Sequence, residues 1–214
     1  MRRLAAALLV GICRCLTGVR ALWLGSVPAA GARVYFANHA SHLDGLVIWA
    51  ALPRALRVRT HPVAARDYWD ATALRRWLAL AVFGAILIDR RAASTGQAAM
   101  PEGAVSERAD VLAPLVAVLE RGEALILFPE GTRGDGETVQ PFRAGLWQLA
   151  QRCPQAAFIP VHLENLNRVL PKGSMLPVPL LCAARFGAPF VPQAEETRGD
   201  YLDRARAAVL ALAR

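Results

Sequence analysis

The 214-residue chain is long enough for one well-buried domain and leaves little room for a second. Its formal charge of +8 is carried almost entirely by arginine, which favours anionic partners such as phospholipid surfaces or phosphorylated substrates. The basic residues are scattered and do not alternate with aromatic ones along a face, so we do not expect a nucleic-acid-binding protein. The four cysteines lack metal-ligand or redox spacing, and we expect buried free thiols in a reducing compartment.

The first 24 residues have the pattern of an amphipathic helix. One face, about 120° wide, carries Arg2, Arg3, Arg14, Thr17 and Arg20, and the opposite face carries Leu4, Leu8, Ile12, Cys15, Leu16, Val19, Leu22 and Trp23. Arginine on one side and Leu and Trp on the other are typical of a helix that lies in a membrane interface. An ordinary helix packed on the domain is one alternative. A signal peptide is another, although Arg14 directly follows the apolar run and no small-residue cleavage site lies close behind.

No stretch reaches the roughly 18 to 20 uncharged apolar residues that a membrane-spanning helix needs. We therefore expect residues 1–25 to form an interfacial amphipathic helix. Residues 26–214 are expected to form the single remaining domain.

In that domain, short apolar runs alternate with helical patterns. Strands are expected at 34–37, within 56–65, and at 85–88, 124–128, 156–160 and 180–186. Helices are expected at 68–83, 107–121, 142–152 and 201–213, with a loop at 92–105. The alternation predicts an α/β fold: a single domain with a mostly parallel or mixed sheet flanked by helices.

A histidine and an aspartate lie five residues apart where the strand at 34–37 ends. His39 can take and return a proton near neutrality, and a carboxylate at Asp44 would orient its ring and stabilise the imidazolium. Five residues on a regular helix are about 140° apart, so the two meet only if His39 precedes the helix that Asp44 begins. Capping is the alternative, because Ser41 as N-cap with Asp44 three residues on resembles a capping box. These residues alone leave both interpretations open.

Three of the predicted strands run directly into polar clusters. The clusters are residues 38–44, Asp89-Arg90 and Glu130-Gly131-Thr132-Arg133. Ligands of open α/β sheets bind outside the carboxyl ends of the strands, so parallel strands would bring the three clusters to one edge. A base, a carboxylate and guanidinium groups at one edge suit the removal of a proton from a hydroxyl on a molecule that carries a phosphate.

Together these segments resemble the glycerolipid acyltransferase family, of the lysophosphatidate acyltransferase type. Four blocks match in the right order: Asn38 to Asp44, Gly84 to Arg90, Phe128 to Arg133, and Ile159-Pro160-Val161. The third block, Phe-Pro-Glu-Gly-Thr-Arg, is very specific, whereas the fourth is weak alone. The chain departs from a minimal family member in its longer loop at 92–106, which shapes the acceptor site, acts as a lid or is neutral surface.

The resemblance implies that His39 is the general base and Asp44 its partner. The substrate-binding residues that it implies are Asn38, Ser41, Arg90, Glu130, Gly131, Thr132, Arg133 and Pro160. Arg90 and the block from Glu130 to Arg133 would bind the acceptor's phosphate, and Pro160 would help to form the acyl-donor side. Two alternatives concern the same residues: Glu130 pairs with an arginine, or His39, His42, Asp44 and Glu130 form a metal site. His61 and His162 are expected to be structural.

The implied activity is transfer of an acyl group from acyl-CoA or acyl carrier protein to the hydroxyl of a lysophospholipid. The favoured acceptor is 1-acylglycerol 3-phosphate, which would give phosphatidic acid. The nearest alternative is another acceptor: glycerol 3-phosphate, another lysophospholipid or a lyso-aminolipid. A non-catalytic membrane-binding protein is the alternative of another class. No metal or other cofactor is expected, and no covalent acyl-enzyme is required because the thioester is already activated. We expect a peripheral or monotopic protein at the cytoplasmic face of the cell membrane, with the phospholipid surface as a partner.

Overall fold

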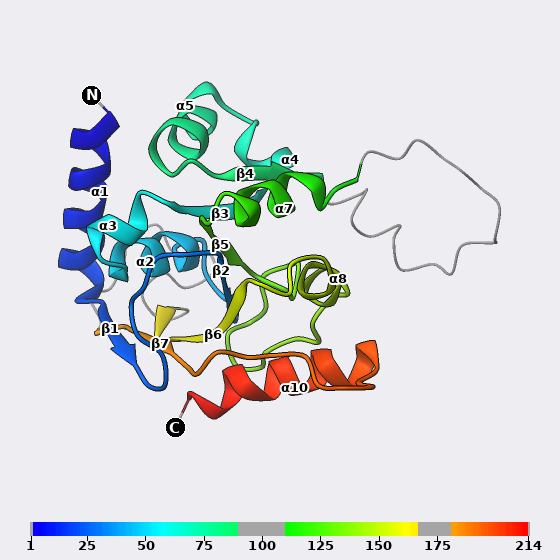
Figure 1. Ribbon diagram of the computed structural model, residues 1–214. Helices are drawn as coiled ribbons and strands as arrows, with labels where there is room; N and C mark the ends of the chain where they lie inside the picture. Colours follow the sequence, from blue (N-terminus) through cyan, green and yellow to red (C-terminus); the bar gives the residue numbers. More distant parts are fainter. Residues whose placement is uncertain (1, 90–109, 167–180, 214) are drawn as a thin grey trace.

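The computed structural model describes residues 2–89, 110–166 and 181–213, and the centre of this part is a seven-stranded sheet (Figure 1). The strands are β1 (Arg20–Trp23), β2 (Arg33–Ala37), β3 (Thr60–Ala65), β4 (Ile86–Ile88), β5 (Ala124–Leu127), β6 (Ala157–Glu164) and β7 (Ala183–Phe186). The helical elements are α1 (Arg2–Thr17), α2 (Asp44–Ala51), α3 (Arg54–Arg57), α4 (Arg66–Trp69), α5 (Ala73–Trp77), the π-helical turn η1 (Leu78–Val82), α7 (Ala113–Glu120), α8 (Gly145–Arg152) and α10 (Arg198–Ala211).

The strand order across the sheet is β1-β7-β6-β2-β5-β3-β4. Neighbouring strands from β6 to β4 are parallel, whereas β7 is antiparallel to β6 and parallel to β1. The predicted α/β fold with a mixed, mostly parallel sheet is therefore confirmed. Phe36 of β2 pairs with Leu127 of β5 and with Pro160 of β6, so the segments that follow β2 and β5 leave the sheet at the same edge.

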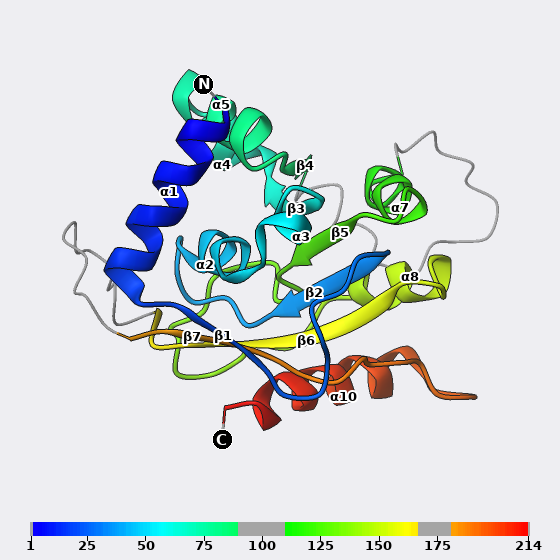
Figure 2. The same cartoon turned by 60° about the vertical axis from the view of Figure 1, so that its left-hand side comes forward.

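The residues of β2 alternate between two hydrophobic cores because successive side chains of a strand point to opposite faces. Tyr35 and Ala37 belong to the core that α1 and α2 cover, and Val34 and Phe36 belong to the core that α7, α8 and α10 cover. Figures 1 and 2 show α2 and α10 on opposite sides of the sheet. A central strand that is covered on both faces explains the unbroken apolar run from Val34 to Ala37.

The helix predicted over residues 2–24 ends at Thr17, and the prediction is wrong beyond that residue. Gly18 follows with a φ of 51°, and its N–H donates to the carbonyl of Arg14, a helix ending that glycine favours because it has no Cβ. Residues 20–23 then form β1 beside β7. Trp23 stacks on Phe186 with 4.1 Å between the ring centroids, so its apolar side chain serves the sheet rather than a helix face.

The helix α1 packs on the domain through part of its arginine-bearing side. Arg14 donates from Nε and Nη2 to the carbonyl of Ala50, and Arg2 donates from Nε to the carbonyl of Ala81. Both carbonyls lie in the last turn of a helical element, where they lack intrahelical partners, so these two arginines bind the domain. The buried residues of α1 are Val10, Cys13 and Thr17.

The opposite side of α1 is uncovered. Its large apolar residues are exposed by 76%, 65% and 47% at Leu4, Leu8 and Ile12. Of the predicted alternatives, packing on the domain therefore applies to one side of the helix, and a leucine-rich face remains on the other. Among the described helices, none combines the length and the apolar composition needed to cross a bilayer.

Other differences from the predicted elements are local. The helix predicted over 68–83 is divided into α4, α5 and η1, because the side chain of Thr72 accepts from the N–H of Arg75 and starts a new helix. The loop predicted at 92–105 and residues 107–109 of the helix predicted at 107–121 lie outside the described residues. From residue 110 on, that helix forms over Ala113–Glu120. All four cysteines are free, and the prediction of burial is wrong for Cys15.

Candidate active site

His39 and Asp44 meet at the carboxyl end of β2. His39 lies in the turn after the strand, Asp44 is the first residue of α2, and 2.8 Å separate Nδ1 of His39 from Oδ2 of Asp44. The carboxylate is buried, whereas the imidazole is 21% exposed and packs against the ring of Phe128 with 4.3 Å between the centroids. An ionised carboxylate only accepts hydrogen bonds, so Nδ1 carries the proton and Nε2 keeps a free lone pair. This is the arrangement of a general base and the group that orients it.

Asp44 also closes the turn in which His39 lies. Its Oδ2 accepts from the backbone N–H groups of Ala40 at 2.7 Å and Ser41 at 2.9 Å. The N-cap of α2 is Leu43, whose N–H donates to Oγ of Ser41, so the prediction of Ser41 as the N-cap is wrong. Asp44 is the first residue of α2, so its contact with the N–H of Ser41 closes the turn before the helix and is not part of a capping box. One carboxylate therefore both orients His39 and holds the turn that carries it.

Glu130 holds the loop after β5 against His39. Its buried carboxylate accepts from the N–H of His39 at 2.6 Å through Oε1 and from the N–H of Gln140 at 2.8 Å through Oε2. In return, the N–H of Gly134 donates to the carbonyl of His39 at 2.8 Å. Burial raises the pKa of Glu130, and the two backbone N–H groups oppose that shift. Within the described residues, the partners of its side chain are thus backbone amides and not an arginine.

Gly131 allows an arginine to lie across this loop. Its φ is 73°, and a Cβ built on it would come within 2.5 Å of Nε of Arg143. That Nε donates to the carbonyl of Glu130 at 3.0 Å, and the N–H of Arg143 donates to the carbonyl of Pro129 at 2.8 Å. The glycine is therefore required twice, for its backbone conformation and for the close approach of Arg143.

Arg133 and His42 meet beside His39, although 91 residues separate them in the sequence. A guanidinium N–H of Arg133 donates to Nε2 of His42, whose ring tilts against that of Tyr68 at 5.3 Å. The loop after β5 thus brings its guanidinium to the turn that carries His39, as the three-cluster argument predicted for Arg133. Arg90, for which the same was predicted, lies outside the described residues.

These residues line a cleft of about 640 Å³ at the carboxyl edge of the sheet. Its polar part contains His39, His42, Gly131, Thr132, Arg133 and Arg143. Its apolar wall includes Leu46 of α2, Trp69, Leu78, Phe83, Ala85, and Leu9 of α1. A cleft with a few convergent polar groups and a long apolar wall suits a molecule with a charged head and a hydrocarbon chain.

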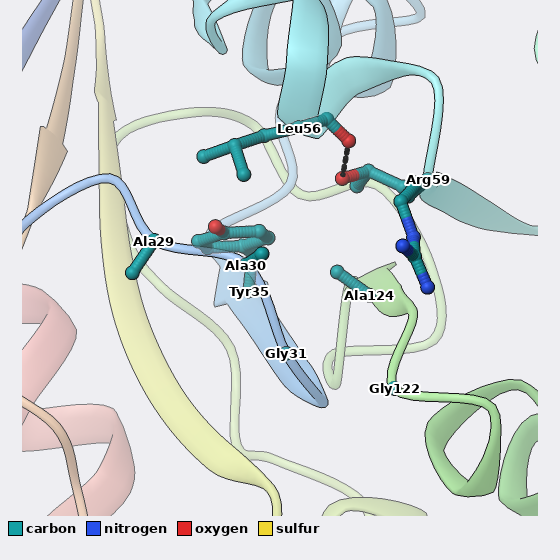
Figure 3. Close-up of a pocket in the computed structure, with 9 residues that line it drawn as sticks. Ala29, Ala30, Gly31, Tyr35, Leu56, Arg59, Gly122 and Ala124 are labelled. Atoms are coloured by element: carbon teal, nitrogen blue, oxygen red, sulfur yellow. Dashed lines mark hydrogen bonds between the residues drawn. The ribbon is translucent and has the colours of Figure 1, made fainter.

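A much smaller hollow lies at the opposite edge of the sheet, near the first residues of β3 and β5 (Figure 3). It holds about 10 Å³ and is lined by Ala30, Tyr35 and Ala124, among others. Beside it, Oγ1 of Thr60 donates to the carbonyl of Leu56 at 2.8 Å. That volume is about the space of one water molecule, so this hollow is no substrate site.

The remaining predicted site residues support the turn and the sheet. The side chain of Asn38 continues the pairing of β2 and β6, because Oδ1 accepts from the N–H of Leu163 at 2.8 Å and Nδ2 donates to its carbonyl at 3.1 Å. Pro160 is buried in β6, beside Gly187. The residues that line the cleft do not include Asn38, Ser41, Glu130 or Pro160.

Sequence reasoning did not identify Arg143 or the apolar wall as parts of this site. Arg143 carries no motif of its own, and the signal that could have found it is Gly131, which indicates a close approach by another group. Among the described residues, no three His, Cys, Asp or Glu side chains form a cluster that could hold a metal ion.

A family model described as Acyltransferase matches residues 24–164, a span that contains every cleft residue from His39 to Arg152. The chain belongs to the Acyltransferase family. Curated relatives match part of the chain: the 1-acyl-sn-glycerol-3-phosphate acyltransferase alpha of Homo sapiens is 33% identical over 140 residues, and that of Mus musculus is 34% identical over the same length. Each match covers 64% of this chain and 42% of the relative, so the chain spans less than half the length of these acyltransferases.

A solved acyltransferase structure has the same fold. The 1-acyl-sn-glycerophosphate acyltransferase PlsC from Thermotoga maritima superposes with a TM-score of 0.68 at 15% identity. The match covers 98% of this chain and 79% of that one.

Proposed function

We propose that this protein transfers an acyl group from a thioester to the hydroxyl of a lysophospholipid. The favoured acceptor is 1-acylglycerol 3-phosphate, and the product is then phosphatidic acid. The observation that carries the proposal is the base His39, held by Asp44 at 2.8 Å, in one cleft with the guanidinium of Arg133. Membership of the Acyltransferase family and the names of the relatives support the same reaction.

The chemistry follows from the tautomer of His39. Its Nε2 accepts the proton of the acceptor's hydroxyl while that oxygen attacks the thioester carbonyl. The tetrahedral intermediate then expels the thiolate, which takes the proton from the imidazolium, so the base is regenerated and no covalent acyl-enzyme forms. The carboxylate of Asp44 stabilises the imidazolium between the two steps. Proton transfer by a positioned base contributes on the order of 10² to 10⁴-fold, and alignment of the two substrates in the cleft contributes further.

Within the cleft, we assign the acceptor's phosphate to Thr132 and Arg133, with Gly131 supplying the backbone of that loop, and we retain Arg90 in this role from its sequence block. The hydrocarbon chains are assigned to the apolar wall that includes Trp69 and Phe83. Four predicted residues support the site without contacting substrate in this scheme, because they hold the turn, the loop and the β6 side of the site: Asn38, Ser41, Glu130 and Pro160. The donor is acyl-CoA or acyl carrier protein, and the reaction needs neither a metal nor another cofactor.

We further propose that the protein is peripheral at the cytoplasmic face of the cell membrane, docked through α1. Leu4, Leu8 and Ile12 present an exposed apolar face that suits the headgroup boundary of a bilayer. Leu9 of the same helix lines the cleft, so docking by this helix would bring the cleft next to the lipid from which an acceptor comes.

The direct test is incubation of the purified protein with acyl-CoA and a panel of lysolipids, with the product identified by mass. Phosphatidic acid formed from 1-acylglycerol 3-phosphate is the expected result. Faster acylation of glycerol 3-phosphate, of another lysophospholipid or of a lyso-aminolipid would replace the acceptor and keep the reaction. Absence of thioester consumption with every acceptor and with both donor types would contradict the proposal and favour a non-catalytic membrane-binding protein.

A further inference from the structure

His42 lies three residues after the base His39, and the reaction described above gives it no task. Its Nε2 contacts a guanidinium N–H of Arg133, and its ring packs against Tyr68. A guanidinium has only donors, so Nε2 of His42 must be the acceptor and the imidazole is neutral with its proton on Nδ1. In the free protein, His42 therefore orients the guanidinium that we assign to the acceptor's phosphate.

Positive charge gathers around His42. Its ring is largely exposed, yet desolvation against the cleft wall lowers its pKa, and the charges of Arg133, His39 and Arg75 lower it further. Arg75 of α5 lies 4.6 Å from the ring of Tyr68, on α4. Asp44 is the carboxylate that opposes this effect, and it is engaged by His39 and two backbone N–H groups. Among the described residues, neither Arg75 nor Arg133 forms an ion pair.

We propose that His42 is a phosphate-binding residue of the acceptor site, which takes up a proton and donates to the phosphate when a phosphomonoester binds. The inference rests on the proposed function, because it places the acceptor's phosphate beside Arg133. A phosphomonoester carries about −1.5 to −2 charges at pH 7, so it offsets the repulsion that keeps His42 neutral. Arg133 then turns its N–H groups to the phosphate, and the imidazolium adds a charge-assisted hydrogen bond.

This arrangement favours a phosphomonoester over a phosphodiester. A diester carries one negative charge, which Arg133 alone balances, and it leaves His42 with little reason to ionise. His42 thus links selection of a lysophosphatidate-like headgroup to the uptake of one proton from solvent.

The test is calorimetric titration of the full-length protein with hexyl phosphate below its micellar concentration, at pH 7.5, in buffers of different ionisation enthalpy. Because the second pKa of a phosphomonoester is near 6, the ligand is almost entirely dianionic at this pH and the proton count reports the protein. His42→Gln keeps an oxygen that can accept from Arg133 but does not titrate. The matched control is His162→Gln, because burial also lowers the pKa of His162, which lies on β6 and outside the cleft residues.

Net proton uptake is expected for the wild type and for His162→Gln, and it should disappear in His42→Gln together with about a tenfold loss of affinity. Uptake that survives in His42→Gln would come from another group, such as His39, and would overturn the inference while leaving the proposed function intact. Hexyl sulfate, which carries one charge and does not titrate, should bind the wild type without uptake, a measurement that requires no variant.

Two further arms separate this inference from the proposed function. If Arg133→Gln binds hexyl phosphate as tightly as the wild type, the cleft does not hold the phosphate. The proposed acceptor would then fail together with the inference. Inorganic phosphate should bind more weakly than hexyl phosphate, because it cannot use the apolar wall. Equal affinities would assign the site to free phosphate and overturn the role of His42 in acceptor binding.

Discussion

Oδ2 of Asp44 lies 2.8 Å from Nδ1 of His39, and the same oxygen closes the turn that carries His39 to the first residue of α2. The orientation of the base is therefore tied to the start of the helix. Two backbone N–H groups donate to the same oxygen as the imidazole, so His39 can rotate or change its protonation state without leaving Oδ2 unpaired. A site held in this way is organised before substrate arrives.

His39→Ala should lower the rate of acyl transfer by about 10² to 10⁴-fold, the usual contribution of a positioned base. The melting temperature should stay near that of the wild type, because His39 lies at the cleft and is partly exposed. Steady-state turnover and thermal unfolding measure the two quantities, with His162→Ala as the control outside the cleft. A variant that retains more than about a tenth of the rate would contradict the general-base role.

Glu130→Gln should weaken the fold and flatten its pH dependence. The pKa of Glu130 is raised above 4.5 by burial, so between 4.5 and the raised value the folded state binds more protons than the unfolded state. Its ionisation therefore lowers the free energy of unfolding as pH rises through that window. The amide does not titrate, but it offers one acceptor to two backbone N–H donors, which should cost about 1 to 3 kcal/mol at pH 7.

Urea unfolding at pH 5 and at pH 7 measures both effects of Glu130→Gln. Glu137→Gln is the matched control, because Glu137 is exposed on the same loop. If the two variants change stability equally at both pH values, the buried carboxylate of Glu130 does not hold the loop as described.

Arg133→Ala should raise the KM for the acceptor by about 10- to 100-fold, as expected for the loss of hydrogen bonds to a charged group, and should change the KM for the donor much less. Arg133→Lys is the finer variant, because lysine keeps the charge and loses the bidentate geometry. Initial rates with each substrate varied in turn give the two constants. Equal increases for donor and acceptor would assign the arginine to the acyl carrier or to the fold.

Gly131→Ala should be more harmful than Gly122→Ala. Both glycines have positive φ, 73° and 67°, so both alanine variants carry a backbone cost of about 1 kcal/mol or more. Only the Cβ at residue 131 would meet Arg143, whereas nothing lies within 4 Å of a Cβ at residue 122. Gly131→Ala alone should therefore also lose activity, and adding Arg143→Ala should recover part of the lost stability. Equal unfolding free energies for the two single variants would refute the close-approach argument.

Replacement of Leu4, Leu8 and Ile12 by serine should abolish sedimentation with liposomes and leave thermal unfolding almost unchanged, because these side chains are exposed. Deletion of α1 is a poorer test, since Val10, Cys13 and Thr17 are buried. Val27→Ser with Val58→Ser, at 67% and 68% exposure, controls for loss of surface hydrophobicity elsewhere. Unchanged liposome binding in the triple variant would remove α1 as the docking element.

The sequence by itself determined those parts of the protein that depend on local pattern and chain order. Apolar runs that end in polar residues placed β2 and β5, and parallel pairing then required their following segments to share one edge. The five-residue spacing of His39 and Asp44 permitted their contact, because a turn followed by the first turn of a helix can bring such residues together.

Only the tertiary structure decided which side of α1 is buried, because both sides of that helix offer contacts. The carbonyls of Ala50 and Ala81, which accept from Arg14 and Arg2, belong to other segments of the chain. The same holds for β1, which forms because β7 provides a partner for its backbone. The contacts of His42 with Arg133 and of Gly131 with Arg143 join residues without any shared periodicity. Their geometry is set by how the loop after β5 docks on the turn after β2, and that docking depends on hydrogen bonds between segments far apart in the chain.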